Sequence, residues 1–325
     1  MKKTELYPLQ FVPQYAYRLW GGNNFNALFN RNTKGNKLGE SWEISGLKER
    51  PSIVLNGPLK TQSLLALIEQ DPEGILGKKV LDRFGKTFPL LIKFIDAKAP
   101  LSVQVHPNDA LAKERHNCFG KSEMWYVVEA EENARLTLGF KSALTRAAFA
   151  QHQKEKTLEE TLHTIKVKKG DAVNVPAGLL HAIGSGVLLA EIQQASDITY
   201  RVYDYDRVDK KTGKKRALHQ DLALDAIDFK IEKQAVISFD QKANKGNTLI
   251  ETPYFKTKFV PIDGECTLDY SARTAFSVVI CVEGKVTVTH QGQHSVITKG
   301  QTLLIPAGIR ELDLQGKGDL LEVTV

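Results

Sequence analysis

Cysteine is scarce in this chain of 325 residues, and the three that occur, Cys118, Cys266 and Cys281, lie far apart in the sequence. Such few and scattered thiols exclude a disulfide-stabilised scaffold and a thiolate zinc site, so buried, unreactive thiols are expected. No apolar run reaches the roughly 18–20 residues that a membrane-spanning helix needs. The N-terminal MKKTELYPLQF also lacks the apolar stretch of a signal peptide. We therefore expect a cytoplasmic protein that does not contact a membrane.

A strong charge bias is absent as well. The net charge of +6 and the isoelectric point near 9.0 are only mildly basic. The densest basic cluster, at 210–216, surrounds a turn-forming glycine and has no interleaved aromatic residues. This composition favours a solvated loop over a nucleic-acid-binding site, and we expect no nucleic-acid partner. The alternative is a local positive field that attracts an anionic substrate.

Strand patterns dominate the sequence, whose length corresponds to about two domains. Helical patterns are few and fall into two clusters, which argues against a regular strand–helix alternation of the Rossmann type. We therefore predict a mainly β fold with short helical insertions. The expected strands are 89–95, 125–128, 277–282 and 286–290, and the expected helices are 62–70, with an apolar stripe, the alanine-rich 143–153, and a short helix that starts with a capping box at 157–160.

An internal repeat indicates how the chain is organised. Residues 169–181 read KGDAVNVPAGLLH, and residues 299–311 read KGQTLLIPAGIRE. In both copies a glycine precedes a proline by six residues, and Ala-Gly follows the proline. The repeat predicts two β domains built on one plan, at 1–238 and 239–325, joined near 239–247.

The first copy holds a set of side chains that can bind a metal. Gln104 and His106 are two residues apart on a predicted strand, so their side chains point to the same face. Glu123 precedes a predicted strand, and His181 follows the Pro-Ala-Gly turn. Two imidazoles, a carboxylate and an amide oxygen suit Zn²⁺, Fe²⁺ or Mn²⁺ better than a soft metal.

Taken alone, each of these residues has a simpler interpretation, as a turn residue, a solvated strand end or a core histidine. The second copy has Glu311 at the position of His181 and no counterpart of Gln104 or His106. We therefore predict one metal site, in the first domain, and a structural second domain. The remaining histidines lack such neighbours, and His290 and His294 flank a Gln-Gly-Gln turn that is typical of a solvated hairpin.

Charged residues and tyrosines are dense from Glu191 to Arg207, directly after His181. Their ordinary interpretation is a polar surface strand with ion pairs. Their position after a candidate ligand favours a strand that lines the same cavity. If residues 197–201 are extended, Asp197 and Arg201 share one face, and Asp197 either pairs with the guanidinium or lies across the substrate from it.

Five segments together resemble the type I mannose-6-phosphate isomerase family, in its short bacterial form. The resemblance covers residues 39–207, with the degenerate repeat after them, and it implies cupin folds in both domains. It also implies one zinc ion per chain and the interconversion of mannose 6-phosphate and fructose 6-phosphate, as part of mannose metabolism. The segments are GESWEIS at 39–45, LSVQVHPND at 101–109, KSEMWY at 121–126, VPAGLLHAIG at 175–184 and the whole of 191–207.

The resemblance also assigns roles to individual residues. It makes His106, Glu123 and His181 zinc ligands, with Gln104 as the fourth. It makes Arg201 the active-site arginine and places Ser102, Lys121, Glu191 and Asp197 in the substrate pocket. Longer family members insert a helical domain between the glutamate and the second histidine. This chain does not, so the residues that hold the phosphate are left unassigned.

Aldose–ketose isomerisation moves a proton between C1 and C2 through an enediol. A metal ion acts in such a reaction as a Lewis acid, and a fixed guanidinium stabilises the charge that develops on oxygen. Glu191, Asp197, Lys121 and a zinc-bound water are the candidate bases. An iron-dependent cupin oxygenase and a non-catalytic sugar-binding cupin are the alternative functions, and oxygen-dependent turnover would identify the first of these.

Overall fold

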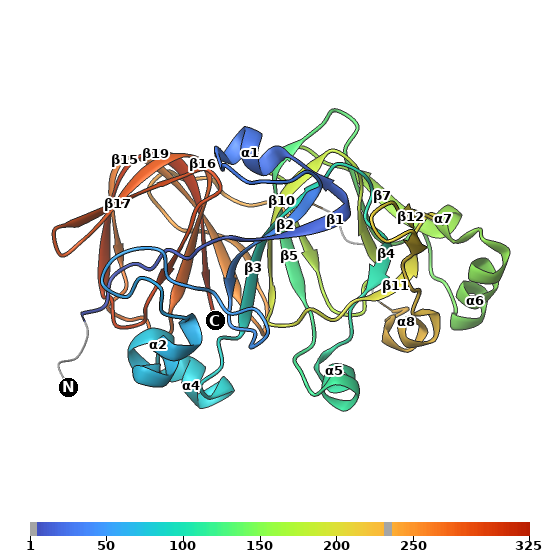
Figure 1. Ribbon diagram of the computed structural model, residues 1–325, viewed down its shortest axis with the longest axis horizontal. Coiled ribbons are helices and arrows are strands. Elements are labelled where there is room, and N and C mark those ends of the chain that lie inside the picture. Colours follow the sequence, from blue (N-terminus) through green and yellow to red (C-terminus); the bar gives the residue numbers. More distant parts are fainter. Residues whose placement is uncertain (1–4, 231–235) are drawn as a thin grey trace.

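Strands carry most of the regular structure, as the sequence predicted. The computed structural model describes residues 5–230 and 236–325. Figure 1 shows two β units side by side, with the helices on the outside. We call the part built on β1 to β11 the first unit and the part built on β14 to β19 the second unit.

The first unit consists of two sheets that pack against each other through one apolar core. The six-stranded sheet has the order β1 (Gln14–Gly22), β2 (Leu38–Ser45), β3 (Leu90–Ala97), β10 (Val187–Gln194), β5 (Glu123–Ala130) and β8 (Ala172–Val175). The five-stranded sheet has the order β11 (Tyr200–Tyr203), β4 (Val103–Val105), β9 (His181–Ile183), β6 (Arg135–Phe140) and β7 (Leu162–Lys166). A short hairpin of β12 (Val208–Asp209) and β13 (Lys214–Lys215) follows β11.

The central strand β10 is buried on both faces, because alternate side chains enter different cores. Leu188, Ala190 and Ile192 belong to a core that extends into the second unit. Leu189 lies in the core between the two sheets of the first unit. Glu191 has the same parity as Leu189, so the strand carries this carboxylate into the interior of the first unit.

The second unit is one sheet of six strands. Residues 277–282 and 286–290, expected as separate strands, form the single strand β16, which has an irregularity between Cys281 and Glu283. The predicted hairpin at His290 is confirmed, since His290 pairs with Gln293. The strands are β14 (Asn247–Glu251), β15 (Lys256–Asp269), β19 (Glu311–Thr324), β16 (Ser277–His290), β17 (Gln293–Thr298) and β18 (Thr302–Ile305), with β18 paired to β16.

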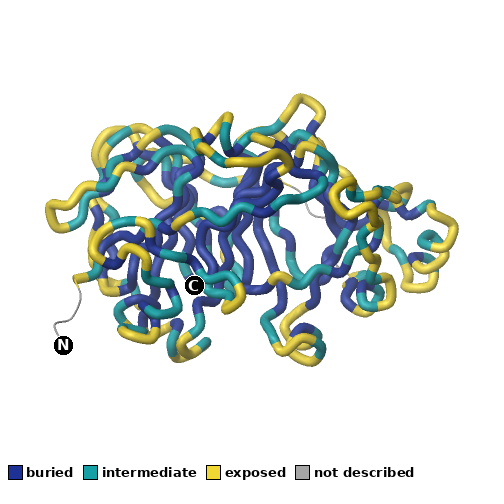
Figure 2. Tube along the Cα trace, viewed as in Figure 1, coloured by how far each residue is buried: buried dark blue, intermediate teal, exposed yellow. Residues whose placement is uncertain are grey.

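The two units share a core. Phe88 of the first unit stacks on Phe276 of the second, with ring centroids 4.6 Å apart. The N-terminal segment runs along the second unit, where Leu9 pairs with Leu304. Figure 2 shows continuous buried chain where the units meet. This core marks no boundary between the units, so the division at 238/239 stays a prediction.

Helices cover the periphery, as Figure 1 shows. The helix expected at 62–70 begins at Leu64, and Ser63 caps it by accepting a hydrogen bond from the Ala66 N–H at 3.1 Å. The capping box at Thr157 does not form, since its side chain makes no cap hydrogen bond; the Thr157 hydroxyl instead lies 2.8 Å from His152 Nδ1. The helices are α1 (Asn24–Phe29), α2 (Leu64–Gln70), α3 (Pro72–Leu76), α4 (Lys78–Phe84), α5 (Asp109–His116), α6 (Arg146–Glu155), α7 (Leu158–Thr161) and α8 (Gln220–Ala226).

All three thiols are free, as expected, although only Cys281 is fully buried. Burial raises the pKa of each of them, which makes Cys118, Cys266 and Cys281 poor nucleophiles. In the described ranges 5–230 and 236–325, no helix has the length and apolar character to cross a membrane.

The aromatic contact between the units should contribute strongly to stability. Phe276 is 0% exposed, and Phe276→Ala is expected to lower the free energy of unfolding by about 3–5 kcal/mol, because it leaves a cavity under Phe88. Denaturant unfolding measures this change. Val296→Ala, at a side chain that is 44% exposed, is the control and should change stability by less than about 0.5 kcal/mol. Equal effects of the two substitutions would contradict a shared core.

Candidate functional site

The predicted metal ligands meet at one end of the first unit. His106 follows β4, Glu123 begins β5, and His181 begins β9. Their ligand atoms lie within 4.8 Å of one another, and each side chain is 1% exposed. Gln104 is the register partner of His181, and its amide Nε2 lies 3.4 Å from His181 Nε2. Residues that are distant in the sequence are thus neighbours because β4 lies between β9 and β11.

Both imidazoles are oriented by the backbone. His106 donates its Nδ1–H to the Ile198 carbonyl and His181 donates its own to the Leu179 carbonyl, each at 2.9 Å. The Nε2 atom of each imidazole therefore carries the lone pair. These Nε2 atoms belong to the group of ligand atoms that lie within 4.8 Å of one another. Hydrogen bonds of this type fix the tautomer that a metal ligand needs.

The carboxylate of Glu123 is oriented in the same manner. Trp125 Nε1 donates to Glu123 Oε2 at 3.1 Å, while Oε1 lies 3.3 Å from His106 Nε2 and 2.6 Å from Lys121 Nζ. Oε1 is buried and accepts no well-aligned hydrogen bond. One carboxylate oxygen thus remains directed at the two imidazoles.

The protonation states suit a cation. Burial, and then the charge of Lys121, lowers the pKa of His106 to about 3, and burial also lowers the pKa of His181. Burial opposes ionisation of Glu123, but the charge of the neighbouring Lys121 outweighs burial and holds the pKa of Glu123 well below its usual range. Two neutral imidazoles and an anionic carboxylate are the forms that bind a borderline divalent metal.

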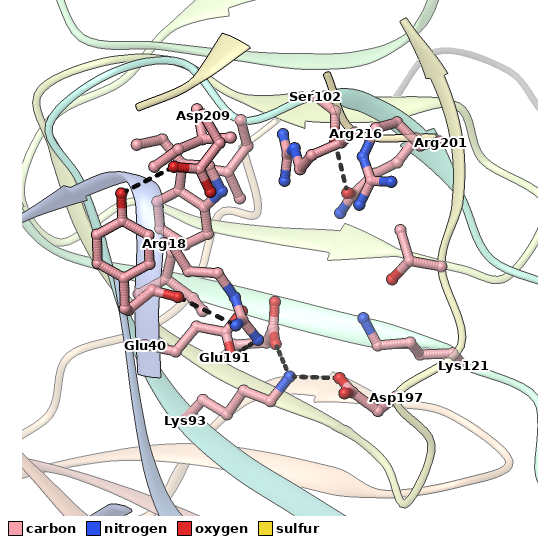
Figure 3. Close-up of a pocket in the computed structure, with 17 residues that line it drawn as sticks. Arg18, Glu40, Lys93, Ser102, Lys121, Glu191, Asp197, Arg201, Asp209 and Arg216 are labelled. Carbon is pink, nitrogen blue, oxygen red and sulfur yellow. Dashed lines mark hydrogen bonds and ion pairs between the residues drawn. The ribbon is translucent and has the colours of Figure 1, made fainter. Parts of the chain in front are cut away.

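A cavity of about 390 Å³ opens beside this cluster. Every residue that the sequence analysis assigned to substrate binding or catalysis lines this cavity, and Figure 3 shows these residues around it. The lining residues are Tyr17, Arg18, Leu19, Trp20, Glu40, Lys93, Ile95, Leu101, Ser102, Gln104, Lys121, Glu191, Asp197, Thr199, Arg201, Asp209 and Arg216.

Glu191 is a carboxyl group of the cavity wall whose pKa is raised. It is 5% exposed and is the register partner of Lys93, whose Nζ lies 3.5 Å from its Oε1. Burial, and then the charge of Glu123, raises the pKa of Glu191 to about 7, although Lys93 opposes the shift. A carboxyl group with a pKa near neutrality can both accept and donate a proton.

Asp197 and Arg201 do not form an ion pair, which excludes the first of the two arrangements expected from strand spacing. The second, in which Asp197 lies across the substrate from Arg201, stays a prediction. Asp197 precedes β11 rather than lying on it, and its Oδ1 is 3.5 Å from Lys93 Nζ. Arg201 is the register partner of Gln104 and donates from Nη1 to the Ala217 carbonyl at 2.9 Å. Both side chains line the cavity, but different elements hold them.

Sequence reasoning missed a buried ion network that supports Glu191. Glu40 pairs with Arg18 through two hydrogen bonds of 2.7 and 2.8 Å and accepts a third, of 2.8 Å, from Trp42 Nε1. Lys93 is 3% exposed, and its Nζ lies 4.8 Å from the Trp42 ring centroid. A signal was present, because Lys93 interrupts an apolar run from Leu90 to Ile95. A lysine inside a buried strand requires a carboxylate partner.

The basic cluster at 210–216 is mostly solvated, as predicted, since Lys210, Lys211 and both lysines of β13 are exposed. Arg216 departs from that prediction because it lines the cavity. Its charge is the second cause, after burial, that lowers the pKa of Arg201 to about 10.

Comparison with known proteins identifies the family. Residues 9–152 match the catalytic domain of type I phosphomannose isomerase, and residues 245–325 match the cupin domain of mannose-6-phosphate isomerase. The mannose-6-phosphate isomerase ManA of Bacillus subtilis is 34% identical over 97% of this chain and 98% of its own length. The chain belongs to the type I mannose-6-phosphate isomerase family.

Further relatives agree with this assignment. The probable mannose-6-phosphate isomerase GmuF of Bacillus subtilis is 35% identical over 95% of this chain and 96% of its own length. A crystal structure of mannose 6-phosphate isomerase from Bacillus subtilis has a TM-score of 0.89 and 31% identity, and it covers 98% of this chain and 99% of that one. The predicted mainly β, cupin-type fold is thereby confirmed. The chain is an isomerase of this family, with a sugar phosphate as its substrate.

The site extends beyond the matched catalytic domain. Gln104, His106 and Glu123 fall within residues 9–152, whereas His181 and Glu191 come from the stretch between the two matched regions. In the second unit, Glu311 occupies the position of His181 in the repeat. It is exposed, and its register partner on the neighbouring strand β15 is Asp269. The candidate residues named here, from Gln104 to Glu191, therefore all belong to the first unit.

Removing one ligand should release the metal. The isomerase is expected to hold close to one divalent ion per chain, and His181→Ala and Glu123→Gln should each lose most of it, because fewer donors remain. Elemental analysis of purified protein measures the content. Glu311→Ala is the matched control from the second repeat and should keep the full content. Loss of metal in that control, or a content near two ions, would refute the assignment.

Proposed function

We propose that this isomerase interconverts mannose 6-phosphate and fructose 6-phosphate through an enediol, with one zinc ion held by Gln104, His106, Glu123 and His181. The observation that carries the proposal is a buried nitrogen and oxygen donor set beside a cavity that also holds an ionisable carboxyl group and a guanidinium. The family relatives named above bear this activity in their names.

Zinc fits the donor set. Two imidazole nitrogens and a carboxylate oxygen form the usual three-residue core of a catalytic zinc site. Gln104 adds an amide oxygen when its amide group, whose Nε2 faces His181 here, is turned by 180°. When bound, zinc supplies Lewis acidity that stabilises negative charge on the carbonyl oxygen of the sugar. The protein fixes the ligands in advance through the Ile198 and Leu179 carbonyls and Trp125.

Glu191 is the residue that we assign to proton transfer between C1 and C2. It is a buried residue of the cavity wall, and with a pKa of about 7 it can be either protonated or ionised near neutral pH. Lys121 is less suited, because its ammonium is 2.6 Å from Glu123 Oε1. Asp197 is less suited, because its side chain is half exposed and contacts Lys93. Lys93 holds Glu191 in place from the neighbouring strand.

Arg201 is the group that we assign to stabilising the developing enediolate. Its backbone is paired with Gln104, which places it on the wall nearest the metal ligands. Its Nε is buried and has no hydrogen-bond partner among the described residues, so one donor of this guanidinium is unsatisfied. Ser102, whose hydroxyl lies 3.3 Å from Gln104 Oε1, and Lys121 contribute substrate contacts on the same wall.

The direct test is formation of fructose 6-phosphate from mannose 6-phosphate by zinc-loaded protein, measured in a coupled assay. Treatment with a chelator should abolish turnover, and zinc should restore it. Absence of product from the zinc-loaded protein would reject the proposed function.

Arg201→Ala should lower kcat by about 10²–10³-fold while zinc stays bound, because an electrostatic donor to the transition state is lost. Arg201→Lys should recover little, since an ammonium does not reproduce the planar fork of donors. Steady-state measurements of kcat and KM, with the zinc content determined on the same samples, test this expectation. Arg146→Ala, an exposed arginine on α6, is the control and should leave kcat unchanged. A raised KM with normal kcat would move Arg201 to substrate binding.

Activity should depend on the ionisation of Glu191. Its carboxylate accepts the proton, so kcat/KM should fall as the pH drops below the pKa of Glu191. This pKa is about 7 from burial and Glu123, and a cation at the triad would lower it. Glu191→Gln should cost about 10²–10⁴-fold and remove the acidic limb from the pH profile. An unchanged acidic limb in this variant would assign the limb to another group.

A further inference from the structure

The cavity has a surplus of positive charge at one end. Arg18 is paired with Glu40, and Lys121 with Glu123. Lys93 is shared between two carboxylates of the wall. Arg201, in contrast, forms no ion pair with any residue of the described ranges 5–230 and 236–325. Figure 3 shows Arg201, Arg216 and Ser102 on the side of the cavity opposite Lys93, Glu191 and Asp197.

A single buried carboxylate, Asp204, holds two guanidinium groups at this end. Arg216 donates to it from Nε at 2.9 Å and from Nη2 at 2.6 Å, and Arg207 donates from Nη2 at 2.5 Å. Asp204 is 5% exposed. One negative charge thus faces two positive charges, which leaves a net positive charge beside Arg201.

Arg207 and Arg216 differ in how many of their hydrogen-bond donors remain available to a ligand. Arg207 also bonds the Pro100 carbonyl and the Asp204 carbonyl, stacks on Tyr205 and does not line the cavity. Arg216 lines the cavity, and the hydrogen bonds that it forms within the described chain both go to Asp204. A guanidinium has five N–H donors, so three remain on Arg216 for a ligand.

The hairpin that precedes Arg216 is fixed on both sides of the cavity mouth. Tyr17 of β1 donates its hydroxyl to Asp209 Oδ1 at 3.2 Å, and Lys211 Nζ lies 4.8 Å from the Tyr17 ring centroid. At the other end, the Ala217 carbonyl accepts the hydrogen bond from Arg201. Arg216 therefore lies on a segment that is anchored at both ends, and Asp204 holds its guanidinium.

We infer that Arg216 binds the phosphate group of the substrate and thereby selects phosphorylated over free sugars, with Asp204 as its positioning residue. The inference rests on the proposed function and adds to it the contact that the short chain uses for phosphate. A planar guanidinium with free adjacent donors matches two phosphate oxygens, and the surplus charge matches a dianion. Arg201 remains at the reacting end, beside Gln104.

The test compares Arg216→Gln with Arg207→Gln in the zinc-loaded enzyme. Both variants remove one guanidinium from Asp204, but only Arg216 faces the cavity. Arg216→Gln should raise KM for mannose 6-phosphate and the inhibition constant of inorganic phosphate by about 10–100-fold, with kcat within about threefold, as expected for loss of a charge-assisted hydrogen bond. Arg207→Gln should change each constant by less than about threefold. Thermal melting confirms that both variants are folded.

Two results would overturn the inference. One is an Arg216→Gln variant with unchanged KM and phosphate inhibition. The other is an equal effect of both variants, which would indicate that Asp204, and not a phosphate contact, is responsible. Calorimetric binding of inorganic phosphate separates this question from turnover. If the wild-type enzyme binds phosphate through Arg216 but does not convert mannose 6-phosphate, the proposed function fails and the anion site stands.

Discussion

The antiparallel pairing of β10 with β3 and β5 is the constraint on which the site depends. Register places Glu191 between Lys93 on one side and Trp125 on the other, and it places Gln193 opposite Glu123. Because side chains alternate along a strand, a slip of one residue would turn Glu191 out of the cavity and into the shared core. The apolar residues at 188, 190 and 192 resist this slip, since each is buried in that core. Packing of leucine, alanine and isoleucine thus determines where the carboxylate of Glu191 points.

The site concentrates charge on side chains that are largely buried, such as Glu40, Lys93 and Glu191. Removing an ion from water costs several kcal/mol, and the cost is offset only where a partner and hydrogen bonds are available. Glu40 illustrates this balance. Burial disfavours its charge, but Lys93 and Arg18 outweigh burial and hold the pKa of Glu40 at about 2. Glu191 has weaker compensation and titrates near neutrality. The same environment therefore yields a permanent anion and an ionisable group that can transfer a proton.

The second unit repeats the framework of the site without its ligands. Lys258 pairs in register with Glu322, as Lys93 does with Glu191, and Ser277 stands where Glu123 stands in the first unit. Where the two units meet, residues at equivalent positions of the two repeats contact each other. Lys169 and Lys299, which begin the two copies, each contact both Glu129 and Glu283. This cluster of four charges joins corresponding positions, as expected when two copies of one fold pack face to face.

The sequence by itself determined the mainly β class, the repeat, and the three residues that meet as a candidate metal site, because these depend on local patterns and on rare side chains in specific motifs. It did not determine the partner of Asp197, the roles of Lys93 and Glu40, or the entry of Arg216 into the cavity. These depend on contacts between segments far apart in the chain, such as β1, β3 and the β12–β13 hairpin. The physical reason is that pairing and burial of a charge are properties of its surroundings. A lysine run looks solvated in sequence, and only the folded chain shows that its last arginine is held by a buried aspartate at the edge of the site.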